Sequence, residues 1–323
     1  MDQFTEIISP IKDEFSEFKT HYSSLFSSDV AVTNSLLEFL RSRRGKMMRP
    51  ILILLTAKSF GPIPNNVYHV AAALELLHQG SLIHDDVVDD SDERRGRPSA
   101  NAAFNNKVAV LLGDYVVAMA LEQISKANHI KLITLMSDLT KNLSEGEILQ
   151  LDSRNDKILS EEKYFNIISR KTAYLFSTCT KMSSLLCDTS KKDVEALTRF
   201  GEIAGLCFQI KDDIFDYRHS TEIGKPFGND LREGKFTLPA IYALSRSDRD
   251  WSEAVDLVKN CTASDELISE ITDFTIKNGG IQYAENKMKE LKSQAISILP
   301  SHVPDNLRKA FSCYLDLIIN RQK

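Results

Sequence analysis

The sequence predicts an all-α fold, and three observations favour this class. Apolar residues recur at three- and four-residue spacing along most of the chain, as they do on one face of an α-helix. Only 13 glycines and 9 prolines occur among 323 residues, too few for a protein rich in β-turns. No segment shows convincing strand-like alternation, since the partly β-branched stretch 108–112 runs into Gly113 and further helix-like sequence.

The clearest helix is expected over 67–90, where prolines precede the periodic stretch and Gly96-Arg97-Pro98 follows it. Further helices are expected at about 5–25, 30–40, 47–59, 100–124, 129–153, 161–187, 191–217, 236–246, 263–278, 281–298 and 304–320. Loops are expected at 60–66, 91–99, 154–159, 218–235 and 299–303. No linker divides the chain, so residues 1–323 are interpreted as a single domain.

Composition places few limits on function. Hydrophobic content is 42% and charged content is 26%, both ordinary for a globular protein, and a net charge of −5 gives no indication of nucleic-acid binding. The five cysteines form no C-x-x-C pair, which favours reduced thiols in a cytoplasmic protein. Neither a secretory signal nor a membrane-spanning segment is expected, so any contact with a membrane would be peripheral.

Two aspartate clusters of the same design lie 127 residues apart, and each reads D-D-x-x-D. They comprise Asp85, Asp86 and Asp89 in the first cluster, and Asp212, Asp213 and Asp216 in the second. Because positions i and i+4 share a helix face, the outer carboxylates of each cluster are stacked and repel one another. A hard divalent cation relieves this repulsion, and Mg²⁺ combines carboxylates with water and phosphate oxygens. The clusters therefore predict Mg²⁺ ions around a diphosphate, held in the central cavity of a helical bundle.

Basic residues near the first cluster fit a phosphate group. Arg94 and Arg95 follow it at the end of the expected helix, and guanidinium groups bind diphosphate oxygens bidentately. Upstream, Lys46 and Arg49 lie at a helix start, where backbone N–H groups also favour an anion. His78 lies two helical turns before Asp85, on the same face. A helix-terminal basic pair or a lone histidine is often structural, but their combination with an acidic cluster favours substrate binding.

The segment after the second cluster is a glycine-punctuated loop that carries Lys225 and Lys235. Such a loop is typical of a lid that brings positive charge onto a bound phosphate group. An ordinary surface loop is the alternative.

These motifs together resemble the trans-isoprenyl diphosphate synthases, or polyprenyl synthetases. The pattern D-D-x-x-D-x-S-x-x-R-R-G is matched over 85–96, and F-Q-x-x-D-D-x-x-D over 208–216. Shorter family motifs follow the same order: 45–50 (G-K-x-x-R-P), 145–147 (E-G-E), 171–172 (K-T) and 234–239 (G-K-x-T-L-P). The resemblance covers about 40–245, nearly two thirds of the chain, without a departure inside the catalytic motifs.

The resemblance implies a homodimer with the all-α isoprenoid synthase fold and a deep cavity in each subunit. It implies three Mg²⁺ ions per active site, held by aspartates of both clusters, although not every one of the six touches metal in the family. Arg94, Lys171, Lys225 and Lys235 would then bind the allylic diphosphate, whereas Lys46, Arg49, His78 and Arg95 would bind isopentenyl diphosphate. Lys171, Thr172 and Gln209 would lie beside the reacting carbons.

The implied reaction adds isopentenyl diphosphate units head-to-tail to an allylic diphosphate. In this family a bulky aromatic residue four or five positions before the first aspartate limits the product to short chains. Ser81 and Gly80 occupy those positions here, and Leu77 and Leu74 lie deeper along the same helix. Moving the floor from Gly80 to Leu74 would deepen the pocket by about 9 Å at roughly 1.5 Å per residue. A long-chain product is therefore expected, unless Gly80 serves helix packing.

Three alternatives stay open. The first is a farnesyl or geranylgeranyl diphosphate synthase whose tunnel is closed by another helix. The second is a class I terpene cyclase, which would need only one diphosphate site and should lack the second basic set. The third is a catalytically silent subunit, although such a subunit usually loses aspartates from one cluster.

Overall fold

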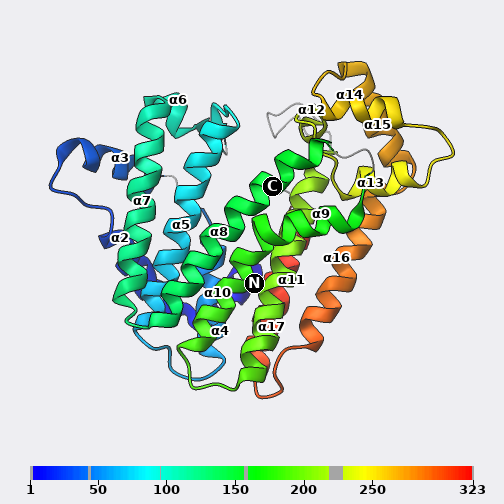
Figure 1. The fold of residues 1–323 in the computed structure, drawn as a ribbon. Helices are drawn as coiled ribbons and strands as arrows, with labels where there is room; N and C mark the ends of the chain where they lie inside the picture. Colours follow the sequence, from blue (N-terminus) through cyan, green and yellow to red (C-terminus); the bar gives the residue numbers. More distant parts are fainter. Residues whose placement is uncertain (1–2, 43–44, 95, 156–158, 218–227, 322–323) are drawn as a thin grey trace. The chain divides into compact units, whose positions relative to one another are not determined.

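The computed structural model describes residues 3–42, 45–94, 96–155, 159–217 and 228–321. Helices account for nearly all of its regular structure, which confirms the all-α prediction (Figure 1). The α-helices of the described residues are α1 (Gln3–Ile8), α2 (Lys12–Ser24), α3 (Ala31–Arg41), α4 (Met48–Lys58), α5 (Asn66–Val88), α6 (Ala100–Phe104), α7 (Asn106–Lys126), α8 (Ile130–Asp152), α9 (Glu161–Ile168), α10 (Tyr174–Leu185), α11 (Lys191–Phe215), α12 (Asn229–Arg232), α13 (Leu238–Ser245), α14 (Ser252–Lys259), α15 (Asp265–Lys277), α16 (Gly280–Ser297) and α17 (Asp305–Asn320).

The chain divides into two compact units. The first comprises residues 1–137, 178–198 and 300–313, and the second comprises 138–177, 199–299 and 314–323. Helices α8, α10, α11 and α17 contribute residues to both units. The interpretation of residues 1–323 as one domain stays a prediction.

In the first unit, α5 packs along α7 and against α4 (Figure 1). Two glycines make the α5–α7 approach possible. A Cβ added at Gly80 would lie 2.9 Å from the Val117 Cγ2 atom, and one added at Gly113 would lie 2.2 Å from the His84 Nε2 atom. At each glycine, a side chain of the facing helix therefore occupies the space that a Cβ would need.

The second unit contains a hydrophobic core built mainly from residues of α12 to α15. α13 packs against both α15 and α16. The buried residues of this core are Tyr217, Leu231, Ala240, Leu244, Trp251, Val255, Val258, Ile268 and Ile271. This packing anchors the segment 228–237, which returns to the end of α11 and helps to build the candidate site.

Three helices expected from periodicity are interrupted in the structure. A 3₁₀ turn over Ser9–Ile11 separates α1 from α2, because Pro10 cannot donate a backbone hydrogen bond. Asn105, at a φ of 123°, separates α6 from α7. A π-helical turn, η3 (Ser169–Ala173), separates α9 from α10. Periodicity cannot detect these breaks, because the apolar pattern continues through them.

The structure also contains elements that the sequence did not predict. α12 lies within the expected loop 218–235, and α14 lies between two predicted helices. A minimal antiparallel pair, β1 (Glu93–Arg94) and β2 (Arg97–Pro98), lies within the expected loop 91–99. Such short pieces carry too few residues for a periodic signal.

The expectation that no segment could span a membrane was wrong for α7 as far as length and composition are concerned. Among the described helices, α7 is the one that is both long enough and apolar enough to cross a membrane. Its most apolar 18-residue stretch has a mean hydropathy of 1.5, and 39% of that stretch is buried. One such helix is weak evidence for a membrane span, because apolar helices of other kinds meet the same criteria.

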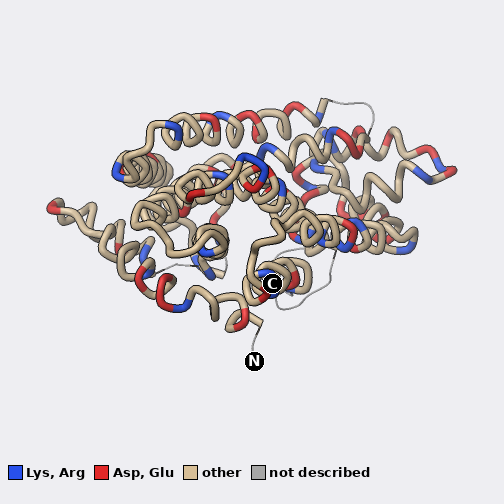
Figure 2. Tube along the Cα trace, turned by 90° about the horizontal axis from the view of Figure 1, so that it is seen from below, with Lys and Arg blue, Asp and Glu red and all other residues tan. Residues whose placement is uncertain are grey.

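Acidic and basic residues are interspersed along the described trace (Figure 2).

Candidate active site

The first aspartate cluster lies at the C-terminal end of α5. Asp85 and Asp86 belong to its last turn, and the backbone N–H of Asp89 donates to the Asp85 carbonyl at 2.8 Å. The C-terminal end of a helix carries partial negative charge, which disfavours carboxylates. Three aspartates at this place are therefore arranged against the helix dipole, and a cation would relieve the repulsion.

Arg94 supplies one such cation to the middle aspartate. Its Nε donates to both carboxylate oxygens of Asp86 at 2.8 and 2.9 Å, and its Nη2 lies 2.7 Å from Oδ1. Asp86 is only 4% exposed, so the pair compensates a buried charge. The predicted diphosphate ligand Arg94 thus has a structural partner within its own motif.

The other predicted phosphate ligands of the first unit lie on two helices. Lys46 is exposed just before α4, whereas Arg49 lies in the first turn of α4 and is 9% exposed. His78 is half-buried on α5. Arg95 lies outside the described residues.

The predicted chain-length positions divide into two groups. His78, Ser81 and Asp85 follow each other along one partly exposed stripe of α5, and Leu74 and Leu77 are buried beyond them. The Ser81 hydroxyl donates to the His78 carbonyl at 2.9 Å. Gly80 instead faces Val117 of α7, and the open floor expected at this position stays a prediction. A side chain at this position would meet α7 before it could reach the stripe that carries Asp85.

The second cluster lies at the C-terminal end of α11, again against the helix dipole. Its middle aspartate, Asp213, is 4% exposed. It accepts hydrogen bonds from the Tyr164 hydroxyl at 2.6 Å and from Gln209 Nε2 at 2.8 Å. Burial raises the pKa of Asp213 to about 7, although both hydrogen bonds act in the opposite direction.

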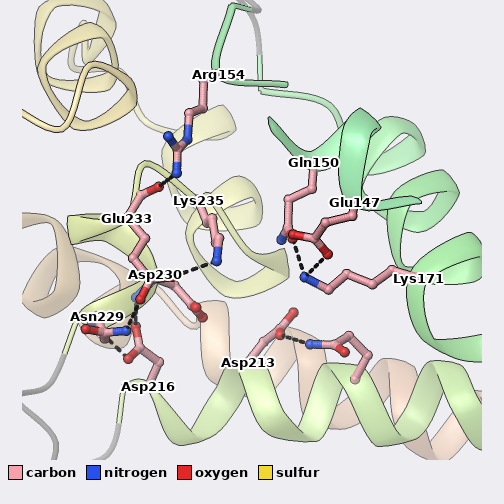
Figure 3. A network of polar contacts seen from close by, with 11 residues as sticks. Glu147, Gln150, Arg154, Lys171, Asp213, Asp216, Asn229, Asp230, Glu233 and Lys235 are labelled. Carbon is pink, nitrogen blue, oxygen red and sulfur yellow. Dashed lines mark hydrogen bonds and ion pairs between the residues drawn. The ribbon is translucent and has the colours of Figure 1, made fainter. Parts of the chain in front are cut away.

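Asp216 connects the second cluster to α12. Its carboxylate accepts the backbone N–H groups of Asn229 at 2.9 Å and of Asp230 at 3.0 Å (Figure 3). Burial raises the pKa of Asp216, and these two hydrogen bonds offset part of the effect. Asp230 is half-buried, and desolvation together with the charges of Asp213 and Asp216 raises its pKa well above the usual range. Three carboxylates thus share one poorly solvated space.

The predicted residues Lys171 and Thr172 lie on the π-helical turn η3. Two glycines hold this turn: a Cβ at Gly146 of α8 would lie 2.6 Å from the Lys171 backbone nitrogen, and a Cβ at Gly205 of α11 would lie 2.5 Å from the Ala173 Cα. π-Helical turns are rare and frequent at functional sites. Here the close approach of α8 and α11 fixes the backbone that carries both predicted residues.

The glutamates on either side of Gly146 hold the basic residues of η3. Glu145 Oε2 pairs with Arg170 at 2.6 Å, and Glu147 Oε2 pairs with Lys171 at 2.5 Å. Lys171 Nζ also donates to Gln150 Oε1 at 2.6 Å (Figure 3). The E-G-E motif therefore has a physical explanation: the glycine permits contact, and its neighbours orient the side chains.

A chain of hydrogen bonds links η3 to the second cluster. Thr172 Oγ1 donates to Gln209 Oε1 at 2.7 Å, and Gln209 Nε2 then donates to Asp213. On the other side, Lys235 Nζ pairs with Glu233 Oε2 at 2.6 Å, and Arg154 Nη2 donates to the Glu233 carbonyl at 2.7 Å (Figure 3). Lys225, the other lysine of the predicted lid, lies outside the described residues.

These groups line a cavity of about 150 Å³ in the second unit. Its polar lining includes Lys171, Gln209, Asp213, Asp230 and Lys235. A larger and more open groove of about 480 Å³ lies between α9, α11 and α16, but it contains none of the predicted site residues. We therefore take the smaller cavity as the candidate site of this unit.

The donor chemistry of both clusters fits a hard divalent cation. All six side chains offer carboxylate oxygens, and burial raises the pKa values of Asp213 and Asp216, so their charged forms are poorly solvated. Within the part of the chain that the structure describes, no three acidic, histidine or cysteine side chains form a ready metal site by themselves.

Comparisons with known proteins agree with this geometry. Residues 30–274 match the polyprenyl synthetase family. The chain belongs to this family. It is 35% identical to an octaprenyl diphosphate synthase of Haemophilus influenzae over 85% of this chain and 84% of that protein. Membership makes it a trans-prenyltransferase and confirms the resemblance and the enzyme class predicted from sequence.

Two solved structures support the same conclusion. A geranylgeranyl pyrophosphate synthase from Bacteroides thetaiotaomicron has 40% sequence identity and a TM-score of 0.86, with 99% of this chain and 100% of that chain covered. A polyprenyl synthase from Caulobacter crescentus, solved with calcium and isoprenyl diphosphate, has 29% identity and a TM-score of 0.90, with 99% and 98% covered. The all-α isoprenoid synthase fold is therefore confirmed.

Sequence reasoning missed several residues of the candidate site. Tyr164 and Asp230 were given no role, although Tyr164 donates to Asp213 and the charge of Asp230 interacts with that of Asp213. Glu147 was recognised in a motif but not as the partner of Lys171. Arg321, which contacts Asp212, lies more than a hundred residues from it in sequence. No spacing rule connects such distant positions, so the fold alone reveals them.

Proposed function

We propose that this polyprenyl synthetase is a Mg²⁺-dependent synthase of long-chain all-trans polyprenyl diphosphates. The observation that carries the proposal is the pair of D-D-x-x-D clusters, each with its carboxylates at a helix C-terminus and with lysine or arginine close by. Substrates would be isopentenyl diphosphate and an allylic diphosphate. Three Mg²⁺ ions would bind per active site, as the family resemblance implies.

In the proposed reaction, the C–O bond of the allylic diphosphate breaks and diphosphate leaves with the electron pair. The double bond of isopentenyl diphosphate attacks the allylic cation, and the released diphosphate accepts the proton that is lost. The product is an allylic diphosphate five carbons longer. Bound Mg²⁺ would supply positive charge to the departing diphosphate.

The protein's own residues would bind and orient the two diphosphates. Ion pairs with Glu147 and Glu233 orient Lys171 and Lys235, respectively, so the position of each ammonium group is fixed before substrate binds. Together with Arg94 and Lys225 they would bind the allylic diphosphate, while the second basic set would hold isopentenyl diphosphate: Lys46, Arg49, His78 and Arg95. Thr172 and Gln209, linked at 2.7 Å, would lie beside the reacting carbons.

Ser81 is the residue that most directly supports a long product. It lies one turn before Asp85 on the partly exposed stripe of α5, where a small side chain leaves room for a growing tail. Leu77 and Leu74 would close the tunnel deeper along the helix. A C20 product is the second candidate, because the chain is 40% identical to a geranylgeranyl pyrophosphate synthase and because Gly80 serves packing.

The deciding experiment incubates purified protein with Mg²⁺, labelled isopentenyl diphosphate and farnesyl diphosphate, and separates the dephosphorylated products by chromatography. A ladder that ends well beyond twenty carbons supports the long-chain proposal. Products that stop at twenty carbons support the second candidate. No elongation would contradict both and favour the cyclase or the silent subunit.

A substitution in the tunnel locates its floor. Ser81→Phe should shorten the longest product, because the ring would lie one turn below Asp85. Gly80→Ala is the matched control, since its methyl group meets Val117 and should lower the melting temperature without changing product length. An unchanged length distribution in Ser81→Phe would show that the tunnel does not follow this stripe.

We also propose a cytoplasmic homodimer that buries the outer face of α7. This face exposes Leu111 to 68%, Leu121 to 52%, Val110 to 41% and Tyr115 to 39%. Several exposed apolar side chains on one helix are typical of a protein interface. Leu111→Glu with Leu121→Glu should yield a monomer in analytical ultracentrifugation, whereas Ile276→Glu on α15 should not. A lipid product would then bring at most peripheral membrane contact.

A further inference from the structure

Arg321, close to the end of the chain, contacts the first aspartate of the second cluster. Its Nη2 lies 2.8 Å from Asp212 Oδ1. The same nitrogen donates to the backbone carbonyl of Phe208 at 2.8 Å. One guanidinium group thus connects the last residues of the chain to the aspartate that opens the D-D-x-x-D motif.

Aromatic side chains hold this guanidinium in place. Its central carbon lies 4.0 Å from the centroid of the Phe208 ring and 5.4 Å from that of the Phe215 ring. Phe208, Asp212 and Phe215 follow at i, i+4 and i+7, so they form one face of α11. Arg321 therefore lies over this face with its planar group stacked on aromatic rings.

This contact differs from a surface ion pair. The Arg321 side chain is 16% exposed and Asp212 is 41% exposed, and the buried Nε has no acceptor among the described residues. Burying a guanidinium with an unsatisfied donor costs free energy, so a merely stabilising contact should avoid it. By contrast, Arg249 stacks on Trp251 and pairs with Glu270 where both charged side chains are about half exposed.

We propose that Arg321 is a positioning residue that fixes the Asp212 carboxylate for a divalent cation bound with diphosphate. The proposal rests on the function proposed above. Carboxylates that bind metal are commonly held by hydrogen bonds from a second layer of residues, and loss of such a partner typically costs about 10–100-fold in metal affinity or activity. Arg321 provides such a bond from a fixed position, and it reaches Asp212 from a different element than the motif itself.

The test measures metal binding and catalysis in parallel on the full-length protein. Thermal shift upon titration with Mg²⁺ in the presence of inorganic pyrophosphate reports binding without turnover. Steady-state kinetics report kcat, the Mg²⁺ concentration for half-maximal rate, and the KM for isopentenyl diphosphate. We expect Arg321→Ala to raise the Mg²⁺ midpoint about 10-fold or more in both assays, with little change in that KM. Arg321→Lys should restore only part of the loss, because an ammonium group lacks the planar fork.

Two controls separate this role from general effects. Arg249→Ala removes an equally stacked and paired arginine of the same unit, and it should leave the Mg²⁺ midpoint unchanged. A chain shortened to end at Arg321, without Gln322 and Lys323, retains the contact and should also behave as wild type. A larger truncation that removes Arg321 as well should reproduce Arg321→Ala.

The possible results are distinguishable. An unchanged or lower Mg²⁺ midpoint in Arg321→Ala would overturn the proposal, the lower value indicating that Arg321 competes with the cation. A change confined to the KM for isopentenyl diphosphate would also overturn it, because Arg321 would then contact substrate. If wild-type protein shows no response to Mg²⁺ and pyrophosphate, the proposed function itself fails, and this inference fails with it.

Discussion

The two aspartate clusters share a motif and a position at a helix C-terminus, but their middle aspartates are compensated differently. Asp86 is paired with the guanidinium of Arg94, which follows it by eight residues. Asp213 instead accepts hydrogen bonds from two neutral donors, Tyr164 and Gln209. The first cluster therefore neutralises its middle aspartate with a cation from its own motif, whereas the second surrounds its middle aspartate with neutral donors and receives a cation, Arg321, at Asp212.

This difference shows how one motif can be built by two physical routes. An ion pair within a motif is local, and it needs only the turn that brings β1 back toward α5. A neutral hydrogen-bond network needs several elements, because its donors come from α9 and α11. We expect the second cluster to depend more strongly on metal and on distant residues than the first.

The largest effect is expected from the first aspartates of the two clusters. Asp85→Ala and Asp212→Ala should each lower kcat by on the order of 10²–10³-fold. Each substitution removes a carboxylate that would bind Mg²⁺, and Mg²⁺ would stabilise the negative charge on the departing diphosphate. Both variants should remain folded by circular dichroism, since each removes a partly exposed carboxylate and not a core residue. Activity retained in only one of them would show that the clusters do not contribute to one reaction centre.

Loss of a neutral donor should have a smaller effect. Tyr164→Phe removes the 2.6 Å hydrogen bond to Asp213 and should lower kcat about tenfold, equivalent to about 1.4 kcal/mol. The matched control is Tyr283→Phe, which loses hydrogen bonds to Glu161 outside the candidate site. Equal losses in the two variants would mean that Tyr164 acts through stability alone, which thermal denaturation of both proteins would reveal.

Neutralising the middle aspartate of each cluster should change the free energy of unfolding with opposite signs. In EDTA at pH 8, Asp86→Asn should lower the free energy of unfolding by about 1 kcal/mol, because Arg94 loses its partner but remains partly exposed. Asp213→Asn should raise it, because a buried charge disappears. Melting temperatures of the two variants against wild type test this contrast, and shifts of the same sign would contradict it.

The pH dependence of metal-free stability should follow Asp213. Its pKa in the folded protein, about 7, lies above the ordinary value of 3.8, so the folded state binds a proton that the unfolded state releases. Its contribution to stability is present below about pH 4 and is lost as the pH rises toward 7. Asp213→Asn should flatten this decline in EDTA, whereas an unaltered profile would assign it to other groups.

Much of the candidate site was predictable from sequence, because its aspartates and lysines lie in short motifs. Helical periodicity placed each D-D-x-x-D on a helix, and i, i+4 spacing made the stacked carboxylates evident. The same reasoning did not reveal that Gly80 packs against α7. A missing side chain reads as open space in sequence, but here it allows Val117 of α7 to approach.

The sequence by itself determined the fold class, the family and the local order of the motifs, because these depend on residue type at fixed spacing along one helix. Only the tertiary structure decided which groups neutralise each aspartate. Tyr164, Asp230 and Arg321 reach the second cluster from separate elements, and Gly146 and Gly205 shape the π-helical turn through close backbone contacts. Burial and partner charge arise from packing, so no spacing along the chain can specify them.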